Sequence, residues 1–350
     1  MSLKPVIGKL VDGIDLGFEE AQESMRLIMS GLATDSQIGC LLTALRMKGE
    51  TVDEVSGLAS AMREYCQRIK PMVDGKLLDT CGTGGDKLNT FNISTIAAFV
   101  AAGAGVSIAK HGNRSVTSKC GSADVLEQLG LRLDLSPKEV EKLIEKVGIG
   151  FIYAPVFHPA MKFAVGPRRE LGIRTVFNVL GPLTNPANAS IQLLGVYSPR
   201  LLEPMAKSLQ NLRVEEAMVV HGMDGMDEIS TVGETRVSWL QDCEVRTINI
   251  KPKDFGVRRT SLEKLRSDSP EHGAEIAYKV LVGSAEEPQM DVVLVNSVAG
   301  IKMAGLSDGF ADGMELARES IESGAAYKKL RMLVKLSGGD LSRLEDFEDE

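Results

Sequence analysis

Apolar residues recur at intervals of three and four in the first seventy residues, which is the spacing of one face of an α-helix. Helices are predicted to start after Thr34 and Thr51, because each hydroxyl is followed three residues later by Gln37 or Glu54, the capping-box pattern. The apolar positions behind these starts are Ile38, Leu41, Leu42 and Leu45, then Val55, Leu58, Met62 and Tyr65. Such stripes face either a core or a subunit interface. We expect a small all-helical N-terminal domain over residues 1–72, completed by helices within about 160–185.

Beyond residue 76, short apolar segments alternate with helical patterns. Strands are predicted at 77–80, 106–109, 151–154, 216–220 and 245–250, and a helix at 136–147 with Ser136 and Pro137 at its start. Residues 274–335 are mainly helical and contain the apolar run 292–298. This alternation predicts an α/β domain over 73–340, with a central, mostly parallel or mixed sheet flanked by helices. Pro71 and Gly75 make 71–76 a predicted hinge, and the acidic tail 341–350 is expected to be a frayed, solvated end.

Two loops rich in glycine and polar residues follow neighbouring predicted strands. The first reads Gly-Thr-Gly-Gly-Asp at 82–86 and leads into an apolar helix at 93–104, and the second covers 110–119. Glycine lets the backbone come close to a ligand, and the free N–H groups at a helix start favour negative charge. The side chains that add hydrogen bonds or positive charge are Asn92, Ser94, Thr95, Lys110, His111, Asn113, Arg114, Ser115, Thr117, Ser118 and Lys119. Both loops therefore predict a site for a polyanion.

The composition narrows the function classes. The chain has 350 residues, of which 43% are hydrophobic and 25% charged, and its formal net charge is -8. This acidity argues against general binding to nucleic acid or a membrane surface, for which a basic excess is usual. We recognise no transmembrane-length apolar run and no signal peptide. The cysteines Cys40, Cys66, Cys81, Cys120 and Cys243 form no C-x-x-C pair, so we expect free thiols and a cytoplasmic protein.

Several motifs occur in a fixed order along the chain. They are Gly82-Thr83-Gly84-Gly85-Asp86, Asn92-Ile93-Ser94-Thr95, Lys110-His111-Gly112-Asn113-Arg114-Ser115, Gly121-Ser122-Ala123-Asp124, His158-Pro159-Ala160-Met161-Lys162, the run 177–186 and Asp227-Glu228-Ile229-Ser230. The ordered set resembles the anthranilate phosphoribosyltransferase family from the helical start to about residue 336. The resemblance implies a pentosyltransferase of tryptophan biosynthesis, in which the anthranilate amine attacks C1 of phosphoribosyl diphosphate and diphosphate leaves.

The resemblance also implies where phosphoribosyl diphosphate and magnesium bind. The donor is expected on Gly82, Gly85, Asp86, Thr90, Asn92, Ile93, Ser94, Thr95, Lys110, His111, Gly112, Asn113, Arg114, Ser115, Val116, Thr117, Ser118 and Ser122. Magnesium, expected as two ions per subunit, would lie between the donor, Ser94, Asp227 and Glu228. Because diphosphate departure separates charge, such a site needs positioning and electrostatic stabilisation more than a strong base. Taken alone, Asp227 and Glu228 are more typical of a solvated acidic turn.

Anthranilate is an aromatic ring with a carboxylate, so its site needs apolar walls and one cation. The resemblance implies that it contacts Gly82, Asn113 and Arg168, with Arg168 pairing with the carboxylate. His111 is expected near the amine and is not assigned as a general base. Taken alone, Arg168 also fits an exposed basic pair with Arg169. The family further implies a homodimer, through the apolar helix stripes.

A few residues depart from the family pattern or from competing motifs. Thr117 and Cys120 stand where serine is expected, and only Thr117 keeps the hydroxyl. Lys87 occupies the last glycine position of G-x-G-x-x-G, and no G-x-x-x-x-G-K-[ST] sequence occurs, so dinucleotide and P-loop sites lose support. The spacing of the histidines matches no metal motif, and His158 and His221 fit structural roles.

Two other function classes stay open at this point. A pyrimidine-nucleoside phosphorylase shares the architecture and uses phosphate as nucleophile, although the segment 158–168 and the pair Asp227-Glu228 favour the transferase. A non-catalytic relative that binds nucleic acid in the same groove is disfavoured by the net charge of -8. For the transferase, we expect the helical domain to close on the α/β domain about 71–76 and to exclude water.

Overall fold

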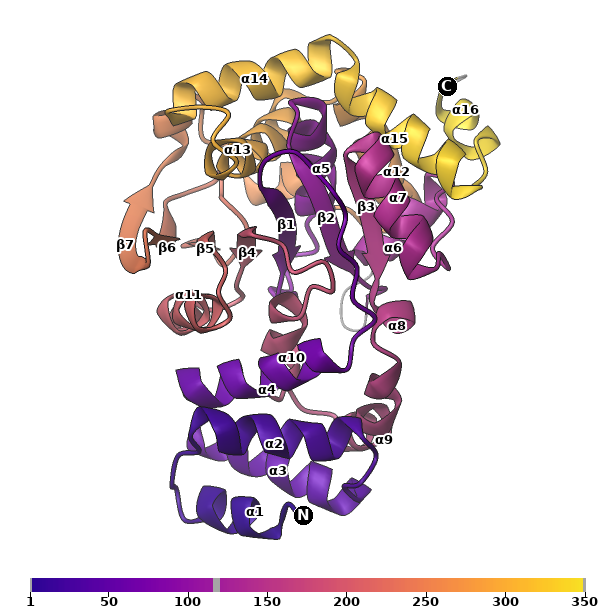
Figure 1. Cartoon of the computed structure of the whole chain (residues 1–350). Helices are drawn as coiled ribbons and strands as arrows, with labels where there is room; N and C mark the ends of the chain where they lie inside the picture. Colours follow the sequence, from indigo (N-terminus) through magenta and orange to yellow (C-terminus); the bar gives the residue numbers. More distant parts are fainter. Residues whose placement is uncertain (1, 116–119, 349–350) are drawn as a thin grey trace.

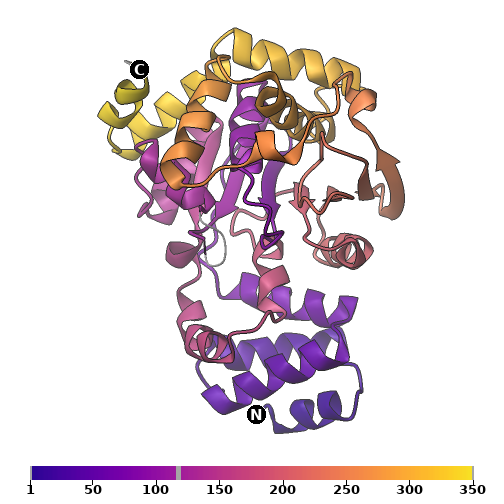
Figure 2. The same cartoon turned by 180° about the vertical axis from the view of Figure 1, so that it is seen from behind.

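The computed structural model describes residues 2–115 and 120–348, which form two parts that Figures 1 and 2 show from opposite sides. One end of the molecule holds α1 (Lys4–Val11), α2 (Phe18–Met29), α3 (Asp35–Lys48), α4 (Val52–Glu64) and α9 (Lys162–Leu171). Helix α9 packs on α2 and α3, and the short α10 (Phe177–Leu180) contacts α4. A later stretch of the chain is thus part of the helical bundle.

The starts of α3 and α4 are capped as the sequence predicted. The Thr34 hydroxyl accepts a hydrogen bond from the Gln37 N–H at 3.3 Å, and the Gln37 side chain accepts one from the Thr34 N–H at 3.2 Å. Thr51 and Glu54 exchange the same pair of bonds at 3.2 and 2.8 Å. The apolar stripes behind the caps are buried within the single chain, at Ile38, Leu41, Leu42, Leu45, Val55, Leu58 and Met62. These residues form a core and offer no surface to a second subunit.

The other end holds a seven-stranded sheet in the order β3-β2-β1-β4-β5-β6-β7. The strands are β1 (Leu77–Gly82), β2 (Ser107–Gly112), β3 (Ile149–Tyr153), β4 (Ile191–Gly195), β5 (Glu216–Gly222), β6 (Thr235–Gln241) and β7 (Glu244–Ile250). The first five are parallel, while β6 and β7 add an antiparallel hairpin at one edge. The predicted α/β class with a mixed sheet is confirmed, but the sequence analysis missed β4 and β6.

The helices of this part pack on both faces of the sheet and on one another. They are α5 (Ile93–Gly103), α6 (Ser122–Gln128), α7 (Pro137–Val147), α8 (Ala154–Phe157), α11 (Leu202–Asn211), α12 (Pro270–Leu281), α13 (Glu287–Met303), α14 (Phe310–Glu322), α15 (Ala325–Ser337) and α16 (Ser342–Glu348), with short 3-10 turns at Pro159–Met161, Gly181–Leu183, Pro199–Leu201, Pro252–Phe255 and Leu262–Leu265. Strand β4 separates two cores: Ile191 and Leu193 join the core with α5 and α13, whereas Leu194 joins the core that continues into the helical bundle.

The prediction of a frayed C-terminal end is wrong for residues 342–348, which form α16. Leu344 is buried, and the Phe347 ring stacks on Tyr278 with 5.6 Å between centroids. The Tyr327 hydroxyl donates a hydrogen bond to the Glu348 carboxylate. The acidic residues alone favour a frayed end, but burial of the two apolar residues Leu344 and Phe347 offsets the cost of ordering the helix.

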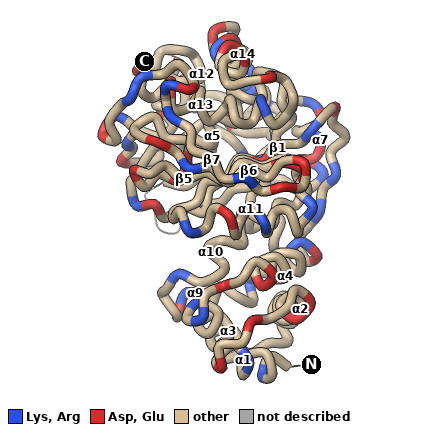
Figure 3. Tube along the Cα trace, turned by 90° about the vertical axis from the view of Figure 1, so that its left-hand side faces the viewer, with Lys and Arg blue, Asp and Glu red and all other residues tan. Residues whose placement is uncertain are grey.

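The surface carries both signs of charge, and Figure 3 shows basic and acidic positions interspersed along the visible trace. No helix among the described residues is long and apolar enough to cross a membrane. The cysteines form no disulfide, in agreement with the expected free thiols.

Candidate active site

The glycine loop 82–86 follows the carboxyl end of β1. Strand β1 lies between β2 and β4, and the chain continues from β1 to β2 and β3 on one side before it returns to β4 on the other. Ligands of open α/β sheets bind at such a switch point because the connections diverge to opposite sides and leave a crevice. The Thr83 N–H donates to the Gly195 carbonyl at the end of β4, at 2.9 Å. Gly84 and Gly85 have positive φ angles of 65° and 83°. The loop therefore folds tightly against the end of the sheet.

Asp227 and Glu228 follow β5 and lie against this loop. The Asp227 Oδ2 atom accepts the Gly84 N–H at 3.1 Å, and the Glu228 Oε1 atom accepts the Ser94 N–H at 3.2 Å. A Cβ at Gly195 would lie 1.6 Å from the Asp227 carbonyl oxygen, so the carboxylate loop approaches β4 as closely as only glycine permits. The structure thus brings together Ser94, Asp227 and Glu228, the predicted metal set.

The electrostatics of this set fit a hard cation. Burial, followed by the Asp86 carboxyl, raises the pKa of Asp227, and burial, followed by Asp227, raises the pKa of Glu228. The buried Asp86 Oδ2 atom has no hydrogen-bond partner among the described residues. Within those residues, no group of three or more His, Cys, Asp or Glu is arranged around one metal position. Two carboxylates and one hydroxyl suit Mg²⁺, which takes few carboxylates and completes its shell with phosphate and water.

Asn296 of α13 fixes the segment that carries these carboxylates. Its Oδ1 atom accepts the Ile229 N–H and its Nδ2 atom donates to the Ile229 carbonyl, both at 2.9 Å. Nδ2 also donates to the Val292 carbonyl at 2.8 Å, and the side chain is fully buried. This residue was not predicted, because a single Asn within an apolar helix carries no sign of its partner.

Lys110 and His111, at the end of β2, turn inward. Lys110 is buried, and its Nζ atom donates to the Thr80 carbonyl at 2.6 Å and lies 3.5 Å from the Ser94 hydroxyl. Burial lowers the pKa of Lys110, although Asp79 opposes the shift. The Asp79 carboxylate accepts the His111 N–H at 3.1 Å. The ammonium group therefore lies beside the start of α5 and next to the predicted metal set.

The His111 ring faces His158, with 5.0 Å between the ring centroids. The Nε2 atoms of both rings are buried and have no hydrogen-bond partner among the described residues. Burial lowers the pKa of both imidazoles, to about 4 for His158. Both rings are thus neutral near pH 7, and each keeps one ring nitrogen in the interior without a polar partner among the described residues. His158, which the sequence analysis treated as structural, lies beside a predicted site residue, whereas His221 bonds the Val196 carbonyl at 2.7 Å and fits a structural role.

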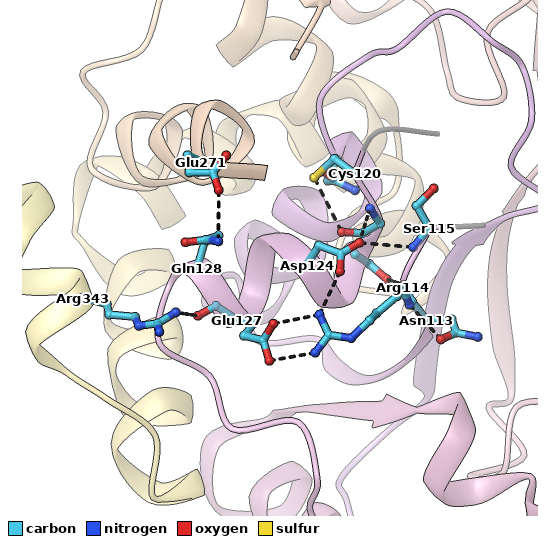
Figure 4. A network of polar contacts seen from close by, with 12 residues as sticks. Asn113, Arg114, Ser115, Cys120, Asp124, Glu127, Gln128, Glu271 and Arg343 are labelled. Atoms are coloured by element: carbon cyan, nitrogen blue, oxygen red, sulfur yellow. Dashed lines mark hydrogen bonds and ion pairs between the residues drawn. The ribbon is translucent and has the colours of Figure 1, made fainter. Parts of the chain in front are cut away.

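The described part of the second loop is held by α6, as Figure 4 shows. The Arg114 guanidinium forms ion pairs with Asp124 at 2.9 Å and Glu127 at 2.7 Å. The other oxygen of Asp124 accepts the N–H groups of Ser115 and Gly121 at 3.2 and 2.8 Å. In this conformation Arg114 is directed to carboxylates, so its phosphate contact stays a prediction. Val116, Thr117 and Ser118 lie outside the described residues.

Other predicted donor residues lie around the same edge. The Asn92 side-chain oxygen accepts a hydrogen bond from the Cys120 thiol at 3.3 Å, and the Ser122 hydroxyl donates to the Asn113 carbonyl at 3.3 Å. Ile93 is buried, so only its backbone can face a ligand. The buried Thr95 hydroxyl has no partner among the described residues. Thr90 forms an isolated bridge with Arg266, and Gly112 ends β2.

Arg168 lies on α9, in the helical part of the molecule. Its guanidinium carbon is 4.8 Å from the centroid of the Phe177 ring, and burial lowers the pKa of the group. No described carboxylate forms an ion pair with it. No hydrogen bond or ring contact in the described chain joins Arg168 to Asn113 or Gly82. The structure therefore brings together residues predicted to bind phosphoribosyl diphosphate at the edge of the sheet. Arg168, the cation predicted to bind anthranilate, lies in the helical part.

Comparisons with known proteins agree with this geometry. Residues 4–66 match the glycosyl transferase family helical bundle domain, and residues 74–327 match the glycosyl transferase family a/b domain. Anthranilate phosphoribosyltransferase of Acetivibrio thermocellus is 52% identical over 340 residues, which cover 97% of this chain and 98% of that protein. The chain belongs to the anthranilate phosphoribosyltransferase family.

Solved structures of the family have the same fold. The enzyme from Thermus thermophilus is 42% identical, with a TM-score of 0.89 and coverage of 95% of this chain and 98% of that chain. The enzyme from Saccharomyces cerevisiae, in complex with PRPP and Mg, is 31% identical, with a TM-score of 0.89 and coverage of 96% and 98%. Another yeast structure contains 4-fluoroanthranilate. The family assignment and its activity, a pentosyltransferase step of tryptophan biosynthesis (EC 2.4.2.18), are confirmed.

Proposed function

We propose that this chain transfers the 5-phosphoribosyl group from phosphoribosyl diphosphate to the amine of anthranilate at the carboxyl edge of its sheet. The observation that carries the proposal is the meeting of the glycine loop 82–86, the start of α5, the Lys110 ammonium and the pair Asp227-Glu228 at that edge. A phosphorylase and a nucleic-acid-binding protein are disfavoured, because the relatives that cover almost the whole chain carry the transferase name.

The donor would occupy the glycine loop and the start of α5. The N–H group of Gly85, the polar side chains of Thr90, Asn92, Ser94 and Thr95, and the loop 110–118 with Ser122 would supply donors for phosphate and ribose oxygens. When diphosphate leaves C1, the ring gains positive charge and the leaving oxygens gain negative charge. Donors fixed before the reaction stabilise that separation without reorganising.

Magnesium would be held by Ser94, Asp227 and Glu228, and when bound it neutralises negative charge on the diphosphate. The yeast relative was solved with PRPP and Mg. We propose two ions per subunit, because the carboxylates of Asp227 and Glu228 contact different backbone groups, the N–H of Gly84 and that of Ser94, and each can face a separate cation.

The acceptor would lie between Asn113, Gly82 and Arg168, with the guanidinium pairing with the carboxylate. His111 lies near the amine, where its neutral ring contributes a polar edge. A relative was solved with 4-fluoroanthranilate. Since Arg168 lies on α9, we propose that the helical domain 1–72 closes on the α/β domain 73–340 about residues 71–76. Scattering profiles that stay identical with and without both substrates would contradict closure.

We propose a cytoplasmic homodimer as the working form. The helical part leaves apolar residues exposed, among them Val11, Ile14, Leu32, Met47 and Val165. Exposed apolar surface is stabilised when a partner covers it. Light scattering coupled to gel filtration tests the proposal, and a mass of one chain at micromolar concentration would contradict it.

The activity is tested by mixing the protein with phosphoribosyl diphosphate, Mg²⁺ and anthranilate and following anthranilate fluorescence. We expect fluorescence to fall only when all three are present. Omission of Mg²⁺ and replacement of the donor by ribose 5-phosphate are the controls. Unchanged fluorescence together with phosphate-dependent cleavage of a pyrimidine nucleoside would overturn the proposal.

A further inference from the structure

Arg174 lies in the connection between α9 and α10, and it contacts two groups in the sheet-containing part of the molecule. Its Nη2 atom donates a hydrogen bond to the Gly85 carbonyl at 2.5 Å. Its guanidinium carbon lies 4.4 Å from the centroid of the Tyr197 ring, which follows β4. A guanidinium group combines these contacts because it stacks on aromatic faces and donates hydrogen bonds in its own plane. Arg174 therefore links the helical part directly to the glycine loop.

The glycine loop is shaped for this contact. A Cβ at Gly85 would lie 2.3 Å from the Arg174 Nη2 atom and would displace the guanidinium, and the φ of 83° at Gly85 would strain any other residue. Tyr197 is joined to the same loop by its backbone, because its N–H donates to the Thr83 hydroxyl at 3.1 Å. The ring that orients Arg174 is thus fixed to the loop that Arg174 contacts.

The charge of Arg174 is available to the loop. In the described part of the chain no carboxylate forms an ion pair with Arg174, in contrast to Arg114, which pairs with Asp124 and Glu127. The Gly85 carbonyl carries a partial negative charge that would repel a diphosphate. A guanidinium bound to that oxygen offsets the charge and adds a positive field at the loop.

We propose that Arg174 is a positioning residue that holds the glycine loop 82–86 in its donor-binding shape and couples it to α9. The inference rests on the proposed donor and acceptor sites. Arg168 and Arg174 are connected by the end of α9. A shift of α9 when Arg168 binds a carboxylate therefore moves the group that contacts Gly85. Donor and acceptor binding then reinforce each other, and by linkage the effect is reciprocal.

The test compares Arg174→Met, Arg174→Lys and Tyr197→Leu with Arg169→Met, an exposed neighbour on α9. Calorimetric titration with phosphoribosyl diphosphate and Mg²⁺ gives donor affinity, and steady-state kinetics give KM for each substrate and kcat. We expect Arg174→Met to raise the donor Kd and KM by about tenfold or more, since a charge-assisted hydrogen bond is lost. The kcat should fall less, Arg174→Lys should recover part of the loss, and Arg169→Met should match the wild type.

A double-mutant cycle makes the test specific to the arrangement. Because the Tyr197 ring is proposed to act through the guanidinium, Arg174→Met with Tyr197→Leu should raise the donor KM by less than the product of the single changes. A donor affinity within about twofold of wild type in Arg174→Met, or effects that multiply fully in the cycle, would overturn the proposal. If Arg174→Met does not melt cooperatively, the Lys and Leu variants decide by the same criterion. If wild type consumes no anthranilate, the proposed function fails, while the donor titrations still decide the role of Arg174.

Discussion

The residues at the carboxyl edge of the sheet are held by buried polar contacts, whereas Arg168 is held by α9 and the Phe177 ring. At the edge of the sheet, Lys110 bonds Thr80, and Asn296 bonds both backbone groups of Ile229. On α9, the cation has one aromatic neighbour and partial exposure. The donor side is therefore fixed before substrate arrives, while the acceptor side depends on the position of a helix.

This difference matches the chemistry of the two substrates. The donor carries most of the charge that changes during the reaction, so its contacts gain most from being fixed in advance. The acceptor needs only orientation toward C1 and exclusion of water, which a closing helix can supply. Changes on the sheet side should therefore reduce catalysis or stability, and changes on α9 should reduce acceptor binding more than donor binding.

The largest effect is expected from Asp227→Asn combined with Glu228→Gln, which removes both proposed metal carboxylates. We expect kcat/KM for the donor to fall by about a thousandfold and the required Mg²⁺ concentration to rise. The reason is that the two negative charges proposed to hold magnesium against the diphosphate are lost. Titrations of activity with magnesium measure both changes. The control is Glu234→Gln, at a glutamate that forms an ion pair with Lys251. An unchanged magnesium titration would remove the pair from the site.

Asn296→Ala should have the next largest effect, on stability. The change leaves the Ile229 N–H and carbonyl without their partner inside the core. We expect the free energy of unfolding to fall by about 3 kcal/mol, because buried backbone groups lose their hydrogen bonds. Urea unfolding measures the loss. Ser297→Ala, next to it on α13, removes one hydroxyl that bonds Val293 and should cost about 1 kcal/mol.

Arg168→Ala tests the acceptor side. We expect KM for anthranilate to rise by about 10 to 100-fold, because one charge-assisted contact to the carboxylate is lost, and KM for the donor to rise by a smaller factor through the coupling of α9 to the glycine loop. Steady-state kinetics in which each substrate is varied at a saturating concentration of the other measure both KM values, with Arg169→Ala as the matched neighbour. Equal losses for both substrates would show that α9 is as firmly coupled to the donor as the sheet residues are.

Much of the sheet side could be predicted from local sequence, and its supporting contacts could not. The glycine loop and the start of α5 are contiguous, so their type and order were readable from the chain. Asn296 and Tyr197 act through partners that are far away in sequence, and a single Asn or Tyr has no pattern. Strand β4 is a short apolar run after a loop rich in proline and asparagine. It forms a strand because it pairs with β1 and β5, which are far away in the sequence or follow a helix.

The smallest effect is expected from pH, through the His158 ring beside His111. Burial lowers the pKa of His158 to about 4 in the folded protein, below the ordinary value near 6.5. Between these pH values the His158 ring binds a proton in the unfolded chain but not in the folded protein. The free energy of unfolding therefore falls as the pH drops below 6.5, and this loss is absent above pH 6.5. At pH 5.5 the loss amounts to about 1 kcal/mol.

Urea unfolding at pH 7.5 and 5.5 measures how much unfolding free energy is lost between the two pH values. The loss should be smaller in His158→Gln than in wild type, whereas His272→Gln, at an exposed position, should behave as wild type. Equal losses in wild type and His158→Gln would mean that the ring accepts a proton in the folded state, and the sheet side would then be less firmly closed to water than its contacts indicate.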